Sequence, residues 1–339
     1  ADWTRNRFTM DEGLSRAVKD VFINLYEEKT IYRGKRLINW DIKLQSAISD
    51  LEVTNIEKNG KLYYLKYPIT NAEQFITVAT TRPETLFGDV AICVNPNDER
   101  YQNIINKTVT IPMINRSIPI ITDESIDKDF GTGCVKITPG HDFNDYKLGK
   151  KHGLEIINIL NKDGTLNDNV SKEFQGVNIH ESRESIVNHL KGLNLIDKIE
   201  DYKTTIPTGE RSGETVEPLI TSQWFMKMDD LVKPAIIAVE NSSTRVIPKN
   251  WEKIYFNWLN NIEDWCISRQ IWWGHRIPAW YDTEGKVYVG NDENDVRKKH
   301  NIDKKVILKQ DNDVLDTWFS SSLWPFTTLG WPEETNELK

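Results

Sequence analysis

The chain has 339 residues, enough for two or three domains, and a net charge of −8. This acidic balance excludes general binding of nucleic acid through positive charge, so any contact with RNA requires a local basic patch. The three cysteines are far apart in the sequence, which argues against a disulfide framework and for a reducing compartment, and we predict a cytoplasmic protein. No segment resembles a signal peptide or an apolar membrane span, so we predict no membrane partner.

Both ends of the sequence resemble interior segments of a longer chain. The first residues, Ala1–Arg5, include no methionine, and the last ones, Pro332–Lys339, stop without a closing element. We therefore expect a fragment.

The first predicted element is an amphipathic helix over residues 11–27, with Asp11 as a plausible cap. Its apolar positions recur at helical spacing and are Leu14, Ala17, Val18, Val21 and Leu25. A short strand at 36–40 and a second apolar segment at 47–53 follow, with a polar turn between them. These elements predict an α/β segment over residues 1–54.

From about Thr54 the sequence changes to short apolar or alternating segments separated by Asn, Pro, Gly and Asp. We predict strands at 61–67, 74–80, 90–94, 108–111 and 118–121. One helix is expected to start just after Pro139 and to run to about His152, and another covers 181–191 and ends at Gly192. The segment 55–206 is therefore predicted to be a β-rich insert.

Near Pro207 the pattern changes again. Residues 208–218 resemble a turn-rich ribbon, residues 231–240 a helix, and residues 251–281 contain six of the twelve tryptophans. Aromatic side chains together with Arg can stack on bases, but such density more often marks a packed core. The segment 207–339 is predicted to return to the α/β fold.

The seven residues Ala79–Thr85, Ala-Thr-Thr-Arg-Pro-Glu-Thr, form the first motif. The strand over 74–80 would deliver Thr80, Thr81 and Arg82 to its end, and residues at strand ends project into clefts. Hydroxyls and a guanidinium in such a place can hold a ribose or a phosphate. Taken alone, an ordinary exit from a strand is the simpler explanation.

The second motif is Gly-Thr-Gly-Cys-Val-Lys-Ile-Thr-Pro-Gly-His-Asp-Phe-Asn-Asp-Tyr, residues 131–146. Its first half is typical of a strand. We predict that Cys134, Val135 and Ile137 are buried and that Lys136 and Thr138 lie on the opposite face. A solvated strand lysine explains Lys136 equally well.

The helix after Pro139 would place Asp142 and Asp145 on one face of its first turn, because they are i,i+3 neighbours. Carboxylates at a helix N-terminus are stabilised by the helix dipole, so we expect both to stay ionised. They could then pair with a substrate ammonium or accept a hydrogen bond from its hydroxyl. A plain capping role is the alternative for Asp142.

Three other chemistries have weaker signals. His141 and Asp142 resemble the His-Asp pair of metal-dependent phosphohydrolases, but the other histidines show no helix-paired pattern, so we predict no metal site. No CxxC pair or Gly-x-Ser-x-Gly elbow occurs, and none of the cysteines has an obvious base partner. A patch of Lys147, Lys150 and Lys151 could contact RNA, although a solvated helix face is the simpler explanation.

In this order, the two motifs resemble the editing-domain motifs shared by the valyl, isoleucyl and leucyl-tRNA synthetases. From residue 2 to residue 332 the chain is similar to the bacterial valyl-tRNA synthetases, a group of class I aminoacyl-tRNA synthetases. Ile-Trp-Trp-Gly-His-Arg-Ile-Pro at 271–278 and Asp-Thr-Trp-Phe-Ser-Ser at 316–321 favour the valyl over the isoleucyl group. An isoleucyl enzyme and a tRNA-binding module without catalysis remain the alternatives.

The resemblance implies a β-barrel-like editing domain inserted into a partial Rossmann-type catalytic domain. It also implies an editing site that hydrolyses threonine mischarged on valine tRNA. The implied catalytic residues are Thr81, Lys136 and Asp145, and the implied substrate-binding residues are Thr80, Arg82, Phe130, Thr138 and Asp142. Asp145 would anchor the substrate α-ammonium, Asp142 would read the threonine hydroxyl, and Phe130 would border the terminal nucleotide. Trp318 matches the position that lines the valine pocket of the synthetic site.

For the full-length enzyme the resemblance implies ATP, Mg²⁺, valine and the acceptor end of valine tRNA as partners, and a monomer. The ATP-handling signatures His-Ile-Gly-His and Lys-Met-Ser-Lys-Ser do not occur in this sequence. We therefore expect no cofactor in this chain and no activation of valine by it. Gly140 stands where the family usually has Ala, and residues 209–214 lack the cysteines with which some relatives bind zinc.

Overall fold

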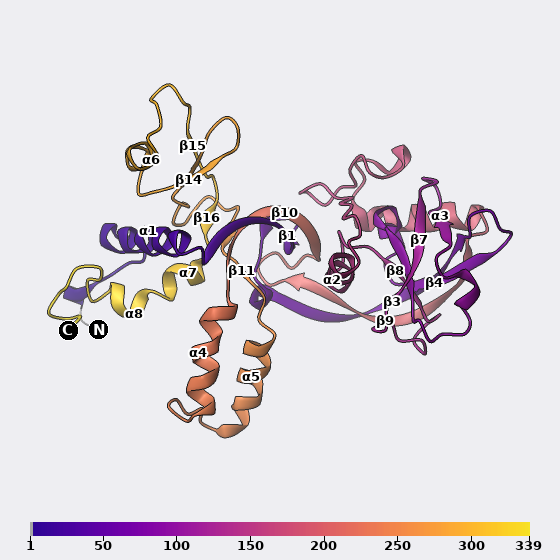
Figure 1. Cartoon of the computed structure of the whole chain (residues 1–339), viewed down its shortest axis with the longest axis horizontal. Helices are drawn as coiled ribbons and strands as arrows, with labels where there is room; N and C mark the ends of the chain where they lie inside the picture. The colour runs from indigo at the N-terminus through magenta and orange to yellow at the C-terminus, as the bar shows by residue number, and fades with distance from the viewer. Residues whose placement is uncertain (1–2) are drawn as a thin grey trace. The chain divides into compact units, whose positions relative to one another are not determined.

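The computed structural model describes residues 3–339, which form two compact units. One unit holds the chain up to Lys35 and from Ser222 onward, and the other is Arg36–Thr221. Two strands, β1 (Ile31–Asp41) and β10 (Val216–Met226), lead from one unit to the other and are neighbours in one sheet (Figure 1). The division into 1–54, 55–206 and 207–339 stays a prediction.

The larger strands of the unit Arg36–Thr221 form two sheets. The first is antiparallel, with the order β4 (Phe75–Thr80), β3 (Val53–Pro68), β9 (Ile196–Gly209). The second has the order β6 (Thr108–Thr110), β7 (Ser117–Thr122), β5 (Ala91–Val94), β8 (Cys134–Ile137). In the second sheet β5 pairs with β7 in parallel and with β8 in antiparallel fashion.

The two sheets approach each other along two borders. β4 lies beside β8, where the Cys134 thiol donates a hydrogen bond to the Thr77 carbonyl at 3.0 Å. β3 lies beside β6, and an isolated bridge joins Ile69 to Val109 just after β3. The predicted α/β class is confirmed, whereas a barrel-like domain stays a prediction because the described strands form two separate hydrogen-bonded sheets.

Helices of this unit bring polar side chains to the sheets. The 3₁₀ helix η3 (Pro83–Gly88) follows β4 and is buried along its whole length, and Pro83, with its fixed φ, suits the first position of this helix. α2 (Phe143–Lys151) follows β8, and α3 (Ile179–Gly192) lies beside η3. Side-chain caps start both helices, from Asp142 and Asn178.

The other unit has an aromatic core. Phe22 of α1 (Glu12–Glu27) meets Trp224 edge to face, with ring centroids 5.3 Å apart, and lies 6.4 Å from Phe319. The other helices are α4 (Asp229–Glu240), α5 (Glu252–Asn260), α6 (Glu293–His300), α7 (Thr317–Ser321) and α8 (Trp324–Thr327). Its short strands are β11 (Trp265–Cys266), β12 (Ser268–Arg269), β13 (Ala279–Tyr281), β14 (Val287–Val289), β15 (Lys309–Gln310) and β16 (Val314–Leu315).

Most predicted elements are confirmed, with three corrections. The segment 47–53 is not a strand: only β2 (Ser46–Ala47) pairs there, and a capping box at Ser49 starts a short 3₁₀ turn instead. The helix predicted from just after Pro139 begins at Phe143, because Asp142 is its cap. In β8, Cys134 and Ile137 are buried as predicted, but Val135 is 36% exposed and Lys136 is buried, because β8 is an edge strand and Lys136 has an ion-pair partner inside.

No helix within residues 3–339 combines the length and the apolar character needed to cross a membrane.

Candidate functional site

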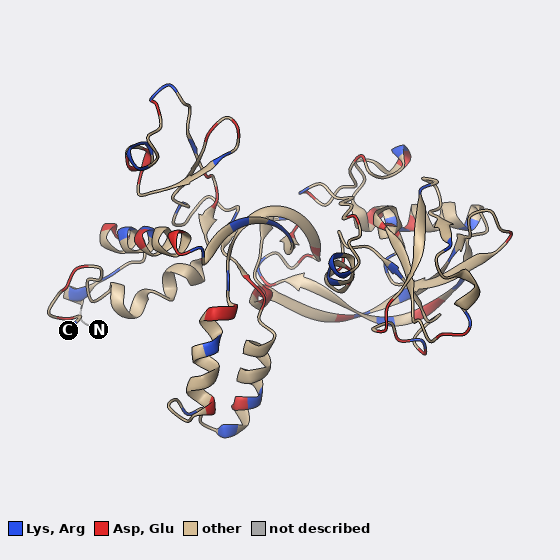
Figure 2. Cartoon of the chain, in the orientation of Figure 1, with Lys and Arg blue, Asp and Glu red and all other residues tan. Residues whose placement is uncertain are grey.

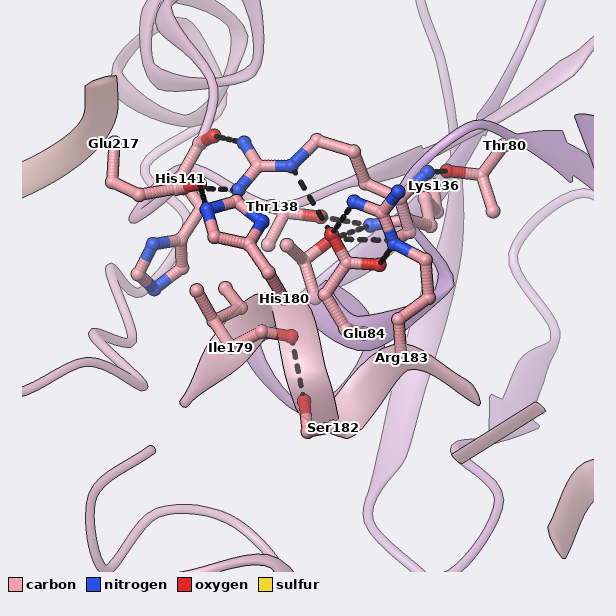
Figure 3. Close-up of polar contacts among 12 residues, drawn as sticks. Thr80, Glu84, Lys136, Thr138, His141, Ile179, His180, Ser182, Arg183 and Glu217 are labelled. Carbon is pink, nitrogen blue, oxygen red and sulfur yellow. Dashed lines mark hydrogen bonds and ion pairs between the residues drawn. The ribbon is translucent and has the colours of Figure 1, made fainter. Parts of the chain in front are cut away.

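The structure brings the two sequence motifs together at the border of β4 and β8. A Cβ added to Gly131 would lie 3.4 Å from the Cβ of Ala79, so the loop before β8 rests against the end of β4. The guanidinium of Arg82 donates to the carbonyl of His141 at 3.0 Å. Figure 3 shows Thr80 and Glu84 of the first motif beside Lys136, Thr138 and His141 of the second. The predicted proximity is confirmed.

Lys136 lies at the centre of a buried polar cluster. Its ammonium donates to the hydroxyls of Thr85 at 2.9 Å and Thr138 at 2.6 Å, and to the Asp89 carboxylate at 2.8 Å. Asp89 also accepts from Thr138 at 2.6 Å and from the Tyr67 hydroxyl at 2.6 Å, and its side chain is fully buried. All three N–H donors of Lys136 are thus engaged within the protein.

Asp89 and Tyr67 are site residues that the sequence reasoning missed. Burial, with the charge of Asp89 beside it, raises the pKa of Tyr67 well above its ordinary value, so its hydroxyl stays protonated as a donor. The available signal was weak: a lone aspartate before an apolar strand resembles a turn residue. Only a neighbour that is distant in sequence, Lys136, makes it part of the site.

Asp142 and Asp145 share the first turn of α2, as predicted, but their environments differ. The exposed Asp142 caps the helix, because its Oδ1 accepts from the amides of Asn144 at 2.8 Å and Asp145 at 3.0 Å. Asp145 is half-buried, and its Oδ2 accepts from the amide of Thr138 at 2.8 Å. The capping explanation therefore holds for Asp142.

The expectation that Asp145 is firmly ionised is wrong. Its burial, together with the nearby charge of Asp142, raises the pKa of Asp145 from 3.8 to about 7. Desolvation outweighs both the helix dipole and the attraction of Lys136, so the carboxyl titrates near neutral pH. Perturbed pKa values of this kind cluster at functional sites.

Arg82 is held by acidic partners rather than open to a ligand. It forms ion pairs with Glu217 and, at 3.6 Å, with Glu84, in addition to its bond to the His141 carbonyl. Glu84 in turn accepts two hydrogen bonds from Arg183, at 2.8 and 2.7 Å. Sequence reasoning missed Glu217 and Arg183, because both lie far from the two motifs in the sequence, and it assigned no role to Glu84 within the first motif.

The remaining predicted residues lie around this cluster. Thr80 Oγ1 accepts from the amide of Arg82 at 3.1 Å, and Thr81 is half-buried in the same turn. Phe130 is 60% exposed on the loop before β8. Trp318 belongs to the other unit, is 57% exposed and follows Asp316, which caps α7.

His141 has a structural environment. It is buried, and its Nε2 accepts from the amide of Ile159 at 2.9 Å. Burial, reinforced by the charge of Arg82, lowers the pKa of His141 to about 3, so the ring is neutral at physiological pH. Among residues 3–339 no group of three or more His, Cys, Asp or Glu side chains is arranged to hold a metal ion.

The basic residues of α2 have partners in their own chain. Figure 2 shows Lys and Arg positions, in blue, along this helix. Lys151 donates to Asp123 at 2.7 Å, and the ammonium of Lys150 lies 4.3 Å from the ring centroid of Tyr146. These contacts agree with the explanation that Lys147, Lys150 and Lys151 belong to a solvated helix face.

Comparison of the sequence with known protein families identifies the family of this chain. A family model described as tRNA synthetases class I (I, L, M and V) matches residues 1–339, and the chain belongs to that family.

Curated relatives narrow the similarity further. The chain is 56% identical over 337 residues to the valine--tRNA ligase of Francisella tularensis, 57% over 338 residues to that of Legionella pneumophila and 56% over 338 residues to that of Coxiella burnetii. These matches cover 99–100% of this chain, which spans about 37% of the length of each relative. A solved LeuRS-tRNA-LeuAMS complex of Agrobacterium radiobacter K84 aligns with 99% of this chain and 47% of its own, at 14% identity and a TM-score of 0.34.

Proposed function

We propose that the unit Arg36–Thr221 carries a hydrolytic editing site of a valine--tRNA ligase, which removes threonine mischarged on valine tRNA. One observation carries this proposal: a half-buried carboxylate, Asp145, lies where the hydroxyl-rich end of β4 meets β8 and the start of α2. The similarity to valine--tRNA ligases over nearly the whole chain supports the choice of substrate.

The substrate offers groups that match this site. An aminoacyl ester carries an α-ammonium, which suits the Asp145 carboxylate, and a threonyl side chain carries a hydroxyl, which suits the exposed carboxylate of Asp142. Pairing with an ammonium would lower the pKa of Asp145 below its value of about 7 and keep it ionised. Valine lacks the hydroxyl, so a valyl ester would leave Asp142 without this partner.

Hydrolysis needs no covalent intermediate on the protein. Water adds to the ester carbonyl, the carbonyl carbon–oxygen bond to the terminal ribose breaks, and the ribose oxygen takes up a proton, which yields threonine and free tRNA. Thr81, in the turn after β4, would orient that water, while Thr80 and Phe130 would border the ribose and base. Lys136 and Thr138 would act indirectly, by holding the buried polar cluster beneath the substrate in place, because Asp89 binds both of their side chains.

The need for such a site follows from pocket chemistry. Threonine and valine have nearly the same shape, and an apolar pocket discriminates against an added hydroxyl only by about 100-fold. A second site that hydrogen-bonds the hydroxyl can remove the error after it has been made. The parent protein would be a cytoplasmic monomer that ligates valine to its tRNA with ATP and Mg²⁺. Its barrel-like editing domain would be inserted into a Rossmann-type domain, in which Trp318 would line the valine pocket. The ATP signatures are not in this sequence, so the ligation step is assigned to none of these residues.

The decisive test is deacylation by this chain of valine tRNA that carries threonine. We expect hydrolysis of the threonyl ester roughly 100-fold or more faster than that of the valyl ester, because only threonine offers the hydroxyl. Equal rates would contradict the proposal, and preference for the valyl ester would indicate an isoleucyl-type site. Tight binding without any hydrolysis would favour a tRNA-binding module, and loss of activity with a chelator would favour a metal-dependent hydrolase.

A Phe130→Ala variant tests the place of the terminal nucleotide. Stacking of a base on an aromatic ring contributes about 1–3 kcal/mol, so the KM for threonyl-tRNA should rise roughly 5- to 100-fold. The unfolding temperature should not change, since the ring is 60% exposed. Phe130→Tyr keeps the stacking surface and is expected to behave as the parent chain. Unchanged KM in Phe130→Ala would place the nucleotide elsewhere.

A further inference from the structure

Four charged side chains near the site form an alternating series of ion pairs, and His180 closes this series into a ring through helix α3. Arg183 binds Glu84, Glu84 contacts Arg82, and Arg82 binds Glu217. His180 Nε2 then lies 3.3 Å from the second carboxylate oxygen of Glu217. His180 and Arg183 are i,i+3 neighbours on α3, so both ends of this series of ion pairs come from one face of the helix (Figure 3).

The acidic members of this ring are deeply buried. The side chain of Glu84 is fully buried and that of Glu217 is 2% exposed. Burial alone would raise the pKa of Glu84, but the hydrogen bonds from Arg183 and the charge of Arg82 outweigh it and hold the pKa below its ordinary value. Glu84 therefore stays ionised between Arg183 and Arg82, and Arg82 in turn lies between Glu84 and Glu217.

The ring also contacts the backbone of the candidate site, through Arg82. With its other terminal nitrogen, Arg82 donates to the carbonyl of His141 at 3.0 Å. His141 directly precedes Asp142, the cap of α2, and Asp145 lies in the same first turn. Through Arg82 the ring thus ties the end of β4 to the start of the helix that carries both carboxylates.

We propose that Glu217 and Arg82 are positioning residues of the editing site: Glu217 aims the guanidinium of Arg82 at the His141 carbonyl and so fixes the first turn of α2. This inference rests on the hydrolytic function proposed above. It changes the role expected for Arg82, whose donors are directed at protein partners and not at a ribose or phosphate. It also gives a function to Glu217, which comes from β10, outside both motifs.

Hydrogen exchange tests the positioning without reference to catalysis. In Glu217→Gln the backbone amides of Asn144, Asp145 and Tyr146, which bond to Asp142, are expected to exchange at least 10-fold faster than in the parent chain. Arg82→Lys should act alike, since one ammonium cannot reproduce the fork that reaches Glu217 and His141 together. The matched control Glu200→Gln, on β9, should leave these amides unchanged. Unchanged exchange in both test variants overturns the inference.

Kinetics separate positioning from direct contact with the substrate. Both test variants should lower kcat for threonyl-tRNA hydrolysis by roughly 10- to 100-fold and leave KM within about twofold, because displaced groups lose alignment and not ground-state binding. A raised KM in Arg82→Lys, with Glu217→Gln unaffected, would show that Arg82 binds the substrate and would overturn the inference. If the parent chain hydrolyses nothing, the hydrolytic function fails while the exchange experiment still decides the positioning. His180→Ala, with a milder decrease in kcat, serves if Glu217→Gln does not fold.

Discussion

The Asp145→Asn variant is expected to be more stable than the parent chain at pH 8, although it should lose about 100-fold or more of its activity on threonyl-tRNA. Holding an ionised carboxylate whose pKa is raised from 3.8 to about 7 costs on the order of 4 kcal/mol of folding free energy at pH 8. The amide removes this charge, and its oxygen can still accept from the amide of Thr138. It cannot pair with a substrate ammonium by charge.

The sign of the pH dependence follows from the direction of the pKa shift. Because the pKa of Asp145 is higher in the folded than in the unfolded chain, its contribution to stability is full below pH 3.8 and is lost as the pH rises towards 7. The advantage of Asp145→Asn should therefore be large at pH 8 and absent near pH 4. In the parent chain, hydrolysis under low substrate concentration should fall as the pH drops below 7.

Thermal unfolding at several pH values checks this expectation. Asp168→Asn, which removes an exposed loop carboxylate, is the matched control and should follow the parent chain at every pH. If Asp145→Asn unfolds at or below the temperature of the parent chain at pH 8, the pKa of Asp145 is not raised by burial in the folded chain. If it retains full activity, Asp145 does not bind the ammonium.

The Asp89→Asn variant should have the largest destabilising effect. Asp89 is the charge partner of the buried Lys136 and accepts from Tyr67 and Thr138 as well. Removal of one member of a buried ion pair leaves the other uncompensated and typically costs about 3–5 kcal/mol. For a unit of this size the unfolding temperature should fall by roughly 10 °C.

A second substitution distinguishes a charge effect from a packing effect. Adding Lys136→Met to Asp89→Asn removes the unpaired ammonium, so the double variant should be more stable than Asp89→Asn alone. Additive losses of stability would mean that the two side chains do not interact. Circular dichroism melts of the two single variants and the double variant provide the comparison.

The sequence predicted local structure well where periodicity decides it. The helix expected over 11–27 is α1 (Glu12–Glu27), and the five strands expected between 61 and 121 all have counterparts in β3 to β7. These segments carry regular apolar spacing, which a chain satisfies only in one secondary structure. The resemblance also implied that the two motifs contribute to one site, and they do lie side by side at the border of β4 and β8.

The charge partners of the site could not be predicted in the same way. Lys136 and Asp89 are 47 residues apart, and Arg82 and Glu217 are 135 apart. Alternation along β8 correctly placed Lys136 and Thr138 on one face but could not say that this face is the interior. That depends on which distant carboxylate arrives opposite the ammonium. For the same reason the raised pKa of Asp145 follows from burial that only the folded chain reveals.

The adjacency of β1 and β10 has a consequence for the history of such chains. The polypeptide leaves the first unit on one strand and re-enters it on the neighbouring strand, so 186 residues occupy the place of a tight hairpin. A gene segment with ends that close together can be gained, exchanged or deleted without moving the strands that flank it. Joining Lys35 to Ser222 through a short turn should therefore leave the first unit able to fold, which a cooperative thermal unfolding transition of the shortened chain would show.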